Sequence, residues 1–225
     1  MLHIVLPSMG RPQQCRRFVE SVLVNARGVV KIFLGLEFSE TGNSAYAGIG
    51  VDLVRYYDPP GRGRRIWNDL ARHAVNEGAS YVMLASDDVV IETPDWDVKL
   101  LNVEIPRREL PHFIFGNDGS CGDRHATHPF LSASWLRVIG KAMPDCVEHY
   151  EGDTFITALG RATGRMFYNP EIITRHMSTK YGLQSHDATS QSLPPVRQAD
   201  WNAYRNSGLG AAEEAEALAR LKEVL

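Results

Sequence analysis

The stretch YVMLASDDVVI, residues 81–91, combines a short apolar run with two adjacent acidic residues. Residues 81–84 are apolar, as in a central strand covered on both faces. Asp87 and Asp88 interrupt this pattern before apolar residues resume at Val89. Because isolated charges are costly to bury, the pair needs water, a metal or cationic partners. Two interpretations stay open. One is a site for a hard cation at the carboxyl end of a strand, and the other is a polar turn in which an aspartate caps the next element.

The residues before this stretch predict alternating strands and helices. Apolar runs favour strands at 2–6, 29–36 and 51–57, and helical spacing of apolar residues favours helices at 12–25 and 66–76. Pro7 is expected to end the first strand, since proline donates no ladder hydrogen bond. Such alternation is the signature of a mostly parallel sheet with helices on its faces.

The residues after the acidic pair continue this pattern up to about position 177. Thr93 is expected to cap a helix with Pro94 at its first position, and a polar, irregular loop is expected at 120–128. Further helices are expected at 135–142 and 154–160, and strands at 112–115, 165–168 and 172–176. We therefore expect one domain over 1–177. Residues 178–225 would form a polar tail or lid ending in an amphipathic helix at 211–225, whose apolar face needs a partner in this domain or another subunit.

The composition indicates a folded protein of about one large α/β domain. The chain has 225 residues, 44% hydrophobic and 23% charged, with a formal net charge of −3. Three cysteines at positions 15, 121 and 146 lack metal-type spacing, which favours reduced thiols and a cytoplasmic location. No apolar run is long enough for a membrane span, and we expect no signal peptide.

Arginines cluster just before the helix expected at 66–76. Residues 61–65 read Gly-Arg-Gly-Arg-Arg. A helix start favours anions, so these arginines are either phosphate contacts or a solvated surface. A second interpretation is a wider basic face, made of Arg62, Arg64, Arg65, Arg107, Arg108, Arg175 and Lys180.

Five short segments together resemble glycosyltransferases of the GT-A fold, more loosely the family 2 enzymes and short phage-encoded proteins related to them. The segments are Val5–Pro12, Arg65–Ala74 with Asn68, Ala85–Asp88 followed by Trp96, Gly152-Asp153, and His176. The resemblance implies a single GT-A (Rossmann-like) α/β domain that uses Mn²⁺ or Mg²⁺. Ser86 stands where that family usually has the first acid of its Asp-x-Asp motif.

The resemblance also implies roles for individual residues. Asp88 and His176 would hold the metal, and Asp153 would be the general base of an inverting reaction. His125 and His128 would line the acceptor side. The donor would be bound by Pro7, Ser8, Arg11, Glu37, Arg62, Arg65, Asn68, Ser86 and Asp87. Each role has a structural alternative: Asp153 as a helix cap, the histidines as ordinary packed or exposed residues, and Arg11 as a solvated cation.

The implied activity is metal-dependent transfer of a sugar from a nucleotide sugar, most readily a UDP-sugar, to an acceptor hydroxyl. The acceptor would be a hydroxymethylated pyrimidine in phage DNA, placing the protein in the host cytoplasm, or a glycan. A nucleotidyltransferase is an alternative, although the loop Ser8–Arg11 lacks the lysine expected there. A non-catalytic nucleotide- or sugar-binding module is another, favoured only by Ser86. The oligomeric state is not readable from the sequence.

Overall fold

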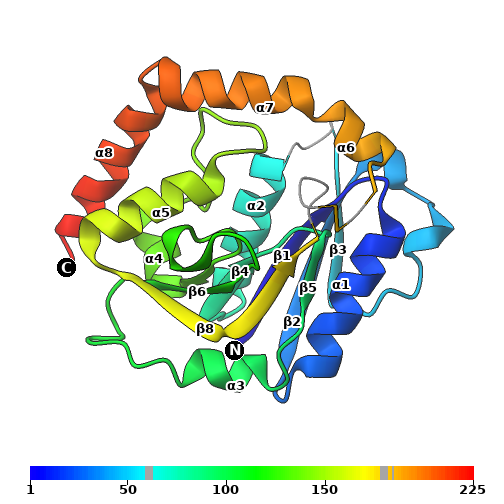
Figure 1. The fold of residues 1–225 in the computed structure, drawn as a ribbon, viewed down its shortest axis with the longest axis horizontal. Helices are drawn as coiled ribbons and strands as arrows, with labels where there is room; N and C mark the ends of the chain where they lie inside the picture. The colour runs from blue at the N-terminus through cyan, green and yellow to red at the C-terminus, as the bar shows by residue number, and fades with distance from the viewer. Residues whose placement is uncertain (59–62, 178–181, 184) are drawn as a thin grey trace.

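The computed structural model describes residues 1–58, 63–177, 182–183 and 185–225. Eight strands form one sheet in the order β3-β2-β1-β4-β7-β6-β8-β5 (Figure 1). The strands are β1 Leu2–Ser8, β2 Val30–Glu37, β3 Leu53–Tyr57, β4 Tyr81–Leu84, β5 Val89–Ile91, β6 Phe113–Asn117, β7 Phe130–Ser132 and β8 Met166–His176. β1 lies between β2 and β4 and is parallel to both, whereas β7 and β5 run antiparallel to their neighbours. The expected mostly parallel sheet is therefore confirmed.

Helices cover both faces of this sheet (Figure 1). They are α1 Pro12–Asn25, α2 Gly63–Asn76, α3 Trp96–Leu101, α4 Ala133–Ile139, α5 Gly152–Thr163, α6 Ala188–Ser192, α7 Pro194–Trp201 and α8 Leu209–Lys222. Short 3-10 helices span Phe38–Glu40, Ser44–Tyr46 and Gly122–Arg124, and a π-helical turn spans Asn202–Asn206.

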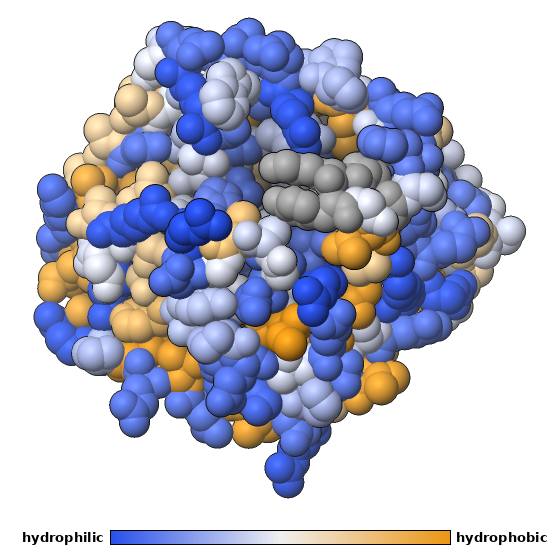
Figure 2. All heavy atoms as spheres, viewed as in Figure 1, coloured by the Kyte–Doolittle hydropathy of each residue, from blue (hydrophilic) through white to orange (hydrophobic). Residues whose placement is uncertain are grey.

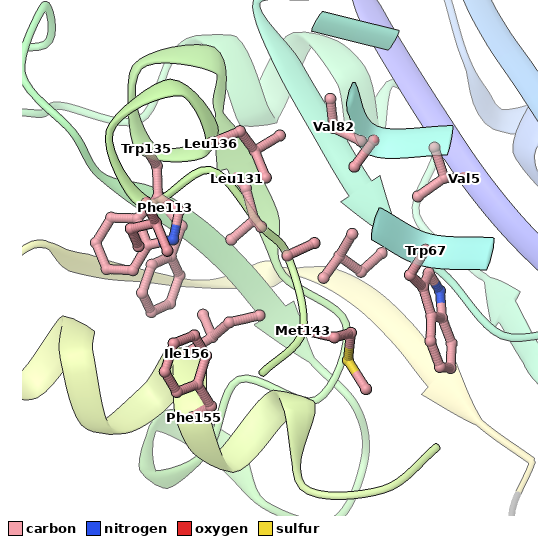
Figure 3. Close-up of a cluster of buried hydrophobic side chains, with 14 of the residues drawn as sticks. Val5, Trp67, Val82, Phe113, Leu131, Trp135, Leu136, Met143, Phe155 and Ile156 are labelled. Carbon is pink, nitrogen blue, oxygen red and sulfur yellow. The ribbon is translucent and has the colours of Figure 1, made fainter. Parts of the chain in front are cut away.

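Alternation along β1 divides the interior into two apolar clusters. Ile4 and Leu6 pack with α1, whereas Val5 points to the opposite face and packs with α2, α4 and α5. Figure 3 shows this second cluster, in which Trp67 of α2 lies near Met143 and the ring of Trp135 meets Phe113 edge-on. Side chains alternate across a strand, so a sheet with helices on both faces buries every residue of β4, as its apolar run predicts.

Three expected boundaries are wrong. β1 continues through Pro7 to Ser8, because β4 pairs with β1 only as far as Val5 and the missing N–H of Pro7 breaks no bond on that side. Thr93 does not cap α3, since its hydroxyl donates to the Glu171 carbonyl and accepts from the Ile173 amide across to β8. The two short strands expected near 165–176 are one long strand, β8, with a register shift against β6.

The segment after residue 185 is more ordered than its polar composition suggested. Asp187 caps α6 through a capping box with Ser190, and Asp200 of α7 accepts the main-chain amides of residues 148–150 at 2.8 Å each. α8 buries Ala217 and Leu221 against the cluster that includes α4 and α5, so its apolar face finds its partner within this chain. In Figure 1, α7 and α8 follow the edge of the molecule.

The face seen in Figure 2 is mostly hydrophilic, with small separate hydrophobic patches. Every helix in the part of the chain that the structure describes is too short or too polar to span a bilayer.

Candidate active site

A cavity of about 800 Å³ opens where three parallel strands end. β1 ends at Ser8, β4 leads into the acidic pair, and β8 ends at His176. The carboxyl edge of an open α/β sheet is where ligands usually bind. The predicted site residues that line the cavity are Pro7, Ser8, Arg11, Glu37, Ser86, Asp87, Asp88, His128, Asp153 and His176.

Asp87 is buried and bonded to the loop that follows β1. Its Oδ2 accepts from the Ser8 hydroxyl at 2.7 Å, and its Oδ1 lies 3.3 Å from Nη1 of Arg11. Burial and the adjacent Asp88 carboxylate raise the pKa of Asp87 to about 7, although Arg11 and Ser8 act in the opposite direction. Asp87 therefore orients the two residues that the sequence suggested for donor contact.

Asp88 faces a different set of partners. The Ser86 hydroxyl donates a short hydrogen bond to Oδ1, and Nε2 of His176 lies 3.4 Å from Oδ2. Burial alone would raise the pKa of Asp88, but the hydrogen bonds from His176 and Ser86 outweigh it and hold the pKa below its usual range. The same carboxylate raises the pKa of His176 against the effect of burial. Ser86 thus supports Asp88 in this arrangement.

His128 lies next to His176 of the Asp88–His176 pair. Its ring is 5.2 Å from the His176 ring, edge to face, and is 7% exposed. Burial and the neighbouring His176 lower the pKa of His128 to about 4, so the imidazole is neutral at neutral pH. Its Nε2 has no hydrogen-bond partner within the described part of the chain. His128 therefore lines the cavity as a neutral ring with a buried, unpartnered nitrogen.

Asp153 lies in the first turn of α5, on the wall of the same cavity. Its Oδ1 accepts the amide of Thr154 at 2.8 Å, and Nε2 of His125 lies 2.9 Å from Oδ2. Burial raises the pKa of Asp153, but His125, the Thr154 amide and His128 together outweigh it and lower the pKa, and the hydrogen bond to Asp153 raises the pKa of His125. The carboxyl group is about one third exposed, at 34%, so a ligand in the cavity can reach it. His125 does not line the cavity and contacts it only through Asp153.

Three residues suggested for the donor lie elsewhere or outside the described residues. Asn68 accepts the amides of Ala142 and Met143 at 2.7 and 2.8 Å and donates to the Met143 carbonyl, so it joins α2 to the segment after α4. Arg65 lies over the Tyr57 ring, away from the cavity wall. Arg62 falls outside the described residues.

Other residues line or organise the cavity without having been suggested from the sequence. The Tyr46 hydroxyl accepts the Arg11 amide at 3.0 Å and lies 3.1 Å from Ser8 Oγ. Asp187 accepts from Nε and Nη2 of Arg11 at 2.8 and 2.9 Å, which attaches α6 to the β1 loop. Arg197 stacks over Tyr150 at 4.7 Å. Asp187 followed three positions later by Ser190 is a helix-start pattern that could have revealed α6.

Comparison with known proteins gives similarity at the level of structure. No protein-family model matches the chain, and the search of curated protein sequences found no significant match. A mannosyltransferase of Pyrobaculum calidifontis, PcManGT, solved with GDP-Man and Mn²⁺, is 10% identical over 99% of this chain and 75% of its own, with a TM-score of 0.58.

Two bacterial enzymes give similar values. TarS (residues 1–349) of S. aureus, in complex with UDP-GlcNAc, is 12% identical over 98% of this chain and 71% of its own, with a TM-score of 0.55. The glucosyl-3-phosphoglycerate synthase of Mycobacterium tuberculosis, solved with Mg²⁺ and UDP, is 11% identical over 90% of this chain and 79% of its own, also at 0.55. The chain therefore has the GT-A fold of nucleotide-sugar glycosyltransferases, as the sequence resemblance implied.

Proposed function

We propose that the protein is a glycosyltransferase that uses a nucleotide sugar and a divalent metal. The observation that carries the proposal is the cavity where three strands end. Its lining includes Ser8, Asp88, Asp153 and His176. The structural neighbours named above were solved with GDP-Man, UDP or UDP-GlcNAc, which supports the same class of donor here.

A divalent metal fits the pair formed by Asp88 and His176. A carboxylate oxygen and an imidazole nitrogen 3.4 Å apart are suitable ligands for Mn²⁺. No group of three or more His, Cys, Asp or Glu side chains suited to a metal occurs among the described residues, so donor phosphates and water would complete the coordination. When bound by Asp88 and His176, such a metal would neutralise charge on a diphosphate leaving group.

The donor nucleotide is assigned to the side of the cavity near β1. Pro7, Ser8 and Glu37 line it, and Asp87 holds Ser8 and Arg11 in place. Arg11 is shared with Asp187, so its positive charge is already balanced there and it is better suited to fix this wall than to bind phosphate. His128 lines the cavity beside the Asp88–His176 pair, and its neutral ring adds no charge there.

Asp153 is proposed as the general base. It would accept the proton of an acceptor hydroxyl while the oxygen forms a bond to the anomeric carbon and the bond from that carbon to the diphosphate oxygen breaks. A single displacement of this kind inverts the configuration. Nε2 of His125 donates a hydrogen bond to Oδ2 of Asp153 and so fixes the orientation of the carboxylate.

Of the two acceptor classes, a glycan is better supported than phage DNA. Two arginines of the supposed basic face are engaged with other groups: Arg108 donates to the Tyr81 hydroxyl at 3.0 Å, and Arg175 lies 2.9 Å from Glu92. Arg62 and Lys180 fall outside the described residues. DNA binding through phosphate contacts would weaken steeply with salt, whereas transfer to a neutral glycan would not.

Calorimetry with nucleoside diphosphates, nucleotide sugars and nucleoside triphosphates, each with and without Mn²⁺, tests the proposal. We expect metal-dependent binding of one nucleotide sugar to the wild type and loss of the metal dependence in Asp88→Asn. Glu92→Gln, which changes a carboxylate away from the cavity wall, is the matched control. Binding of triphosphates alone would indicate a nucleotidyltransferase, and no binding to any compound would refute the proposal.

A further inference from the structure

A second hollow, of about 560 Å³, lies on the other side of helix α2. Gly63, Ile66 and Trp67 of α2 face the cavity described above. Residues 64, 65, 68, 69 and 72 of the same helix line the second hollow together with β3 and Asp145. Residues three and four positions apart share a helix face, so α2 separates two distinct spaces. We call the second one the arginine pocket; its charged lining residues are Arg55, Arg64, Arg65, Arg72, Asp69 and Asp145.

The arginine pocket has an excess of positive charge. Four arginines face two aspartates, whereas the whole chain has a net charge of −3. Asp69 is occupied by the edge strand, since its Oδ2 accepts from Arg55 at 2.6 Å and from the Tyr57 hydroxyl at 2.7 Å. The other carboxylate oxygen of Asp69, Oδ1, lies 4.0 Å from Nη1 of Arg72, which is too far for a hydrogen bond, and the Arg72 side chain is 65% exposed. Like charges gathered in one hollow repel each other, and a bound anion would relieve that repulsion.

Arg64 gives a second, independent indication. Its Nη1 lies 3.4 Å from Asp145 and its Nη2 3.9 Å from Glu148, both longer than the charge-assisted hydrogen bonds of a tight pair. Its Nε is buried and has no hydrogen-bond partner among the residues that the structure describes. A buried donor without an acceptor is costly, so this guanidinium is not fully satisfied by the protein, and its loosely paired Nη1 and Nη2 are the nitrogens that an oxygen ligand would bind.

We propose that the arginine pocket binds a phosphate-bearing small molecule. Planar guanidinium groups match phosphate oxygens in two-point hydrogen bonds. The volume lies within the range of small-molecule sites rather than that of a lone ion. Tyr56, which is 43% exposed on β3, adds an aromatic surface for the rest of such a molecule. The proposal does not rest on the proposed glycosyltransferase activity, because none of the charged residues of the pocket lines the first cavity.

The test uses inorganic pyrophosphate as the probe, with EDTA present to prevent metal-dependent binding in the first cavity. Titration calorimetry and the thermal unfolding midpoint are followed at constant ionic strength, because general screening alone would otherwise change both. The wild type should bind in a saturable manner. Binding should weaken about tenfold in Arg72→Gln and in Arg65→Gln, as expected for loss of one charge-assisted contact. Arg137→Gln removes an exposed arginine of α4 outside the pocket and should bind like the wild type.

Asp145→Asn supplies a change of opposite sign. Asp145 is 65% exposed and competes with a ligand for Arg64, so removing its charge should tighten pyrophosphate binding severalfold. Equal binding by the wild type, Arg72→Gln and Asp145→Asn would overturn the proposal, as would stabilisation that follows ionic strength alone. Arg72→Gln should leave metal-dependent nucleotide binding intact, so failure of this proposal is distinguishable from failure of the proposed activity.

Discussion

Replacing Asn68 distinguishes a structural role from a donor-binding role. In Asn68→Ala, the amides of Ala142 and Met143 lose their acceptor and the Met143 carbonyl loses a donor. Ala142 and Met143 are buried, so water replaces these bonds poorly. At about 1–3 kcal/mol for each buried group left unpaired, partly offset by solvent near α2, the free energy of unfolding should fall by about 2–4 kcal/mol. For a chain of this size, that corresponds to a decrease in Tm of roughly 5–15 °C.

Urea denaturation, combined with nucleotide calorimetry, provides the assay. Asn68→Asp is the matched variant: its carboxylate still accepts both amides but cannot donate to Met143, so its loss should be smaller, about 1 kcal/mol. Nucleotide affinity should change little in either variant, provided that both are folded at the assay temperature. The reasoning is refuted if Asn68→Ala unfolds like the wild type but binds the nucleotide more weakly, since Asn68 would then contact the donor.

Three further predictions concern other parts of the molecule. His125 has a raised pKa and Asp153 a lowered one, so their pair should stabilise the fold fully between about pH 4 and 6.5. The stability difference between the wild type and His125→Gln, measured by urea denaturation, should shrink as pH rises through the raised pKa of His125 or falls through the lowered pKa of Asp153; a difference independent of pH would contradict the pairing. Asp187→Ala removes the α6 cap and two Arg11 contacts, so limited proteolysis after residue 185 should accelerate, with Asp187→Asn, which keeps the cap, closer to the wild type. In Gly116→Ala, the new Cβ would lie 2.2 Å from the Ile172 carbonyl oxygen, forcing β6 and β8 apart at a cost of about 1–3 kcal/mol or more; Gly50→Ala, with only a 3.4 Å contact, should change the unfolding midpoint little.

The sheet and the acidic edge were predictable because their signals are local. The apolar run at 81–84 requires burial on both faces, and the strand–helix alternation before it restricts the topology to a mostly parallel sheet. The GT-A fold itself followed from a resemblance spread over several segments, which the structural neighbours support.

Features that depend on long-range pairing were not predictable. Thr93 has the sequence of a helix cap, but its hydroxyl bonds across the sheet to β8, 78 positions away. Asn68 has no local signal that distinguishes a ligand contact from a bond to residues 142–143. Helices α6 and α7 were missed, whereas α8 was expected, because α6 and α7 are short and polar, and tertiary contacts such as those of Asp200 stabilise α7 more than an apolar stripe would.

The ion pair between Arg11 and Asp187 joins residues 176 positions apart. One wall of the first cavity therefore comes from the opening strand and its loop, and another from residues near the end of the sequence. During synthesis on the ribosome, the sheet up to β8 can assemble before α6 and α7 have emerged. Completion of the cavity then follows assembly of the sheet, so a nascent chain long enough to form the whole sheet would still lack a complete pocket.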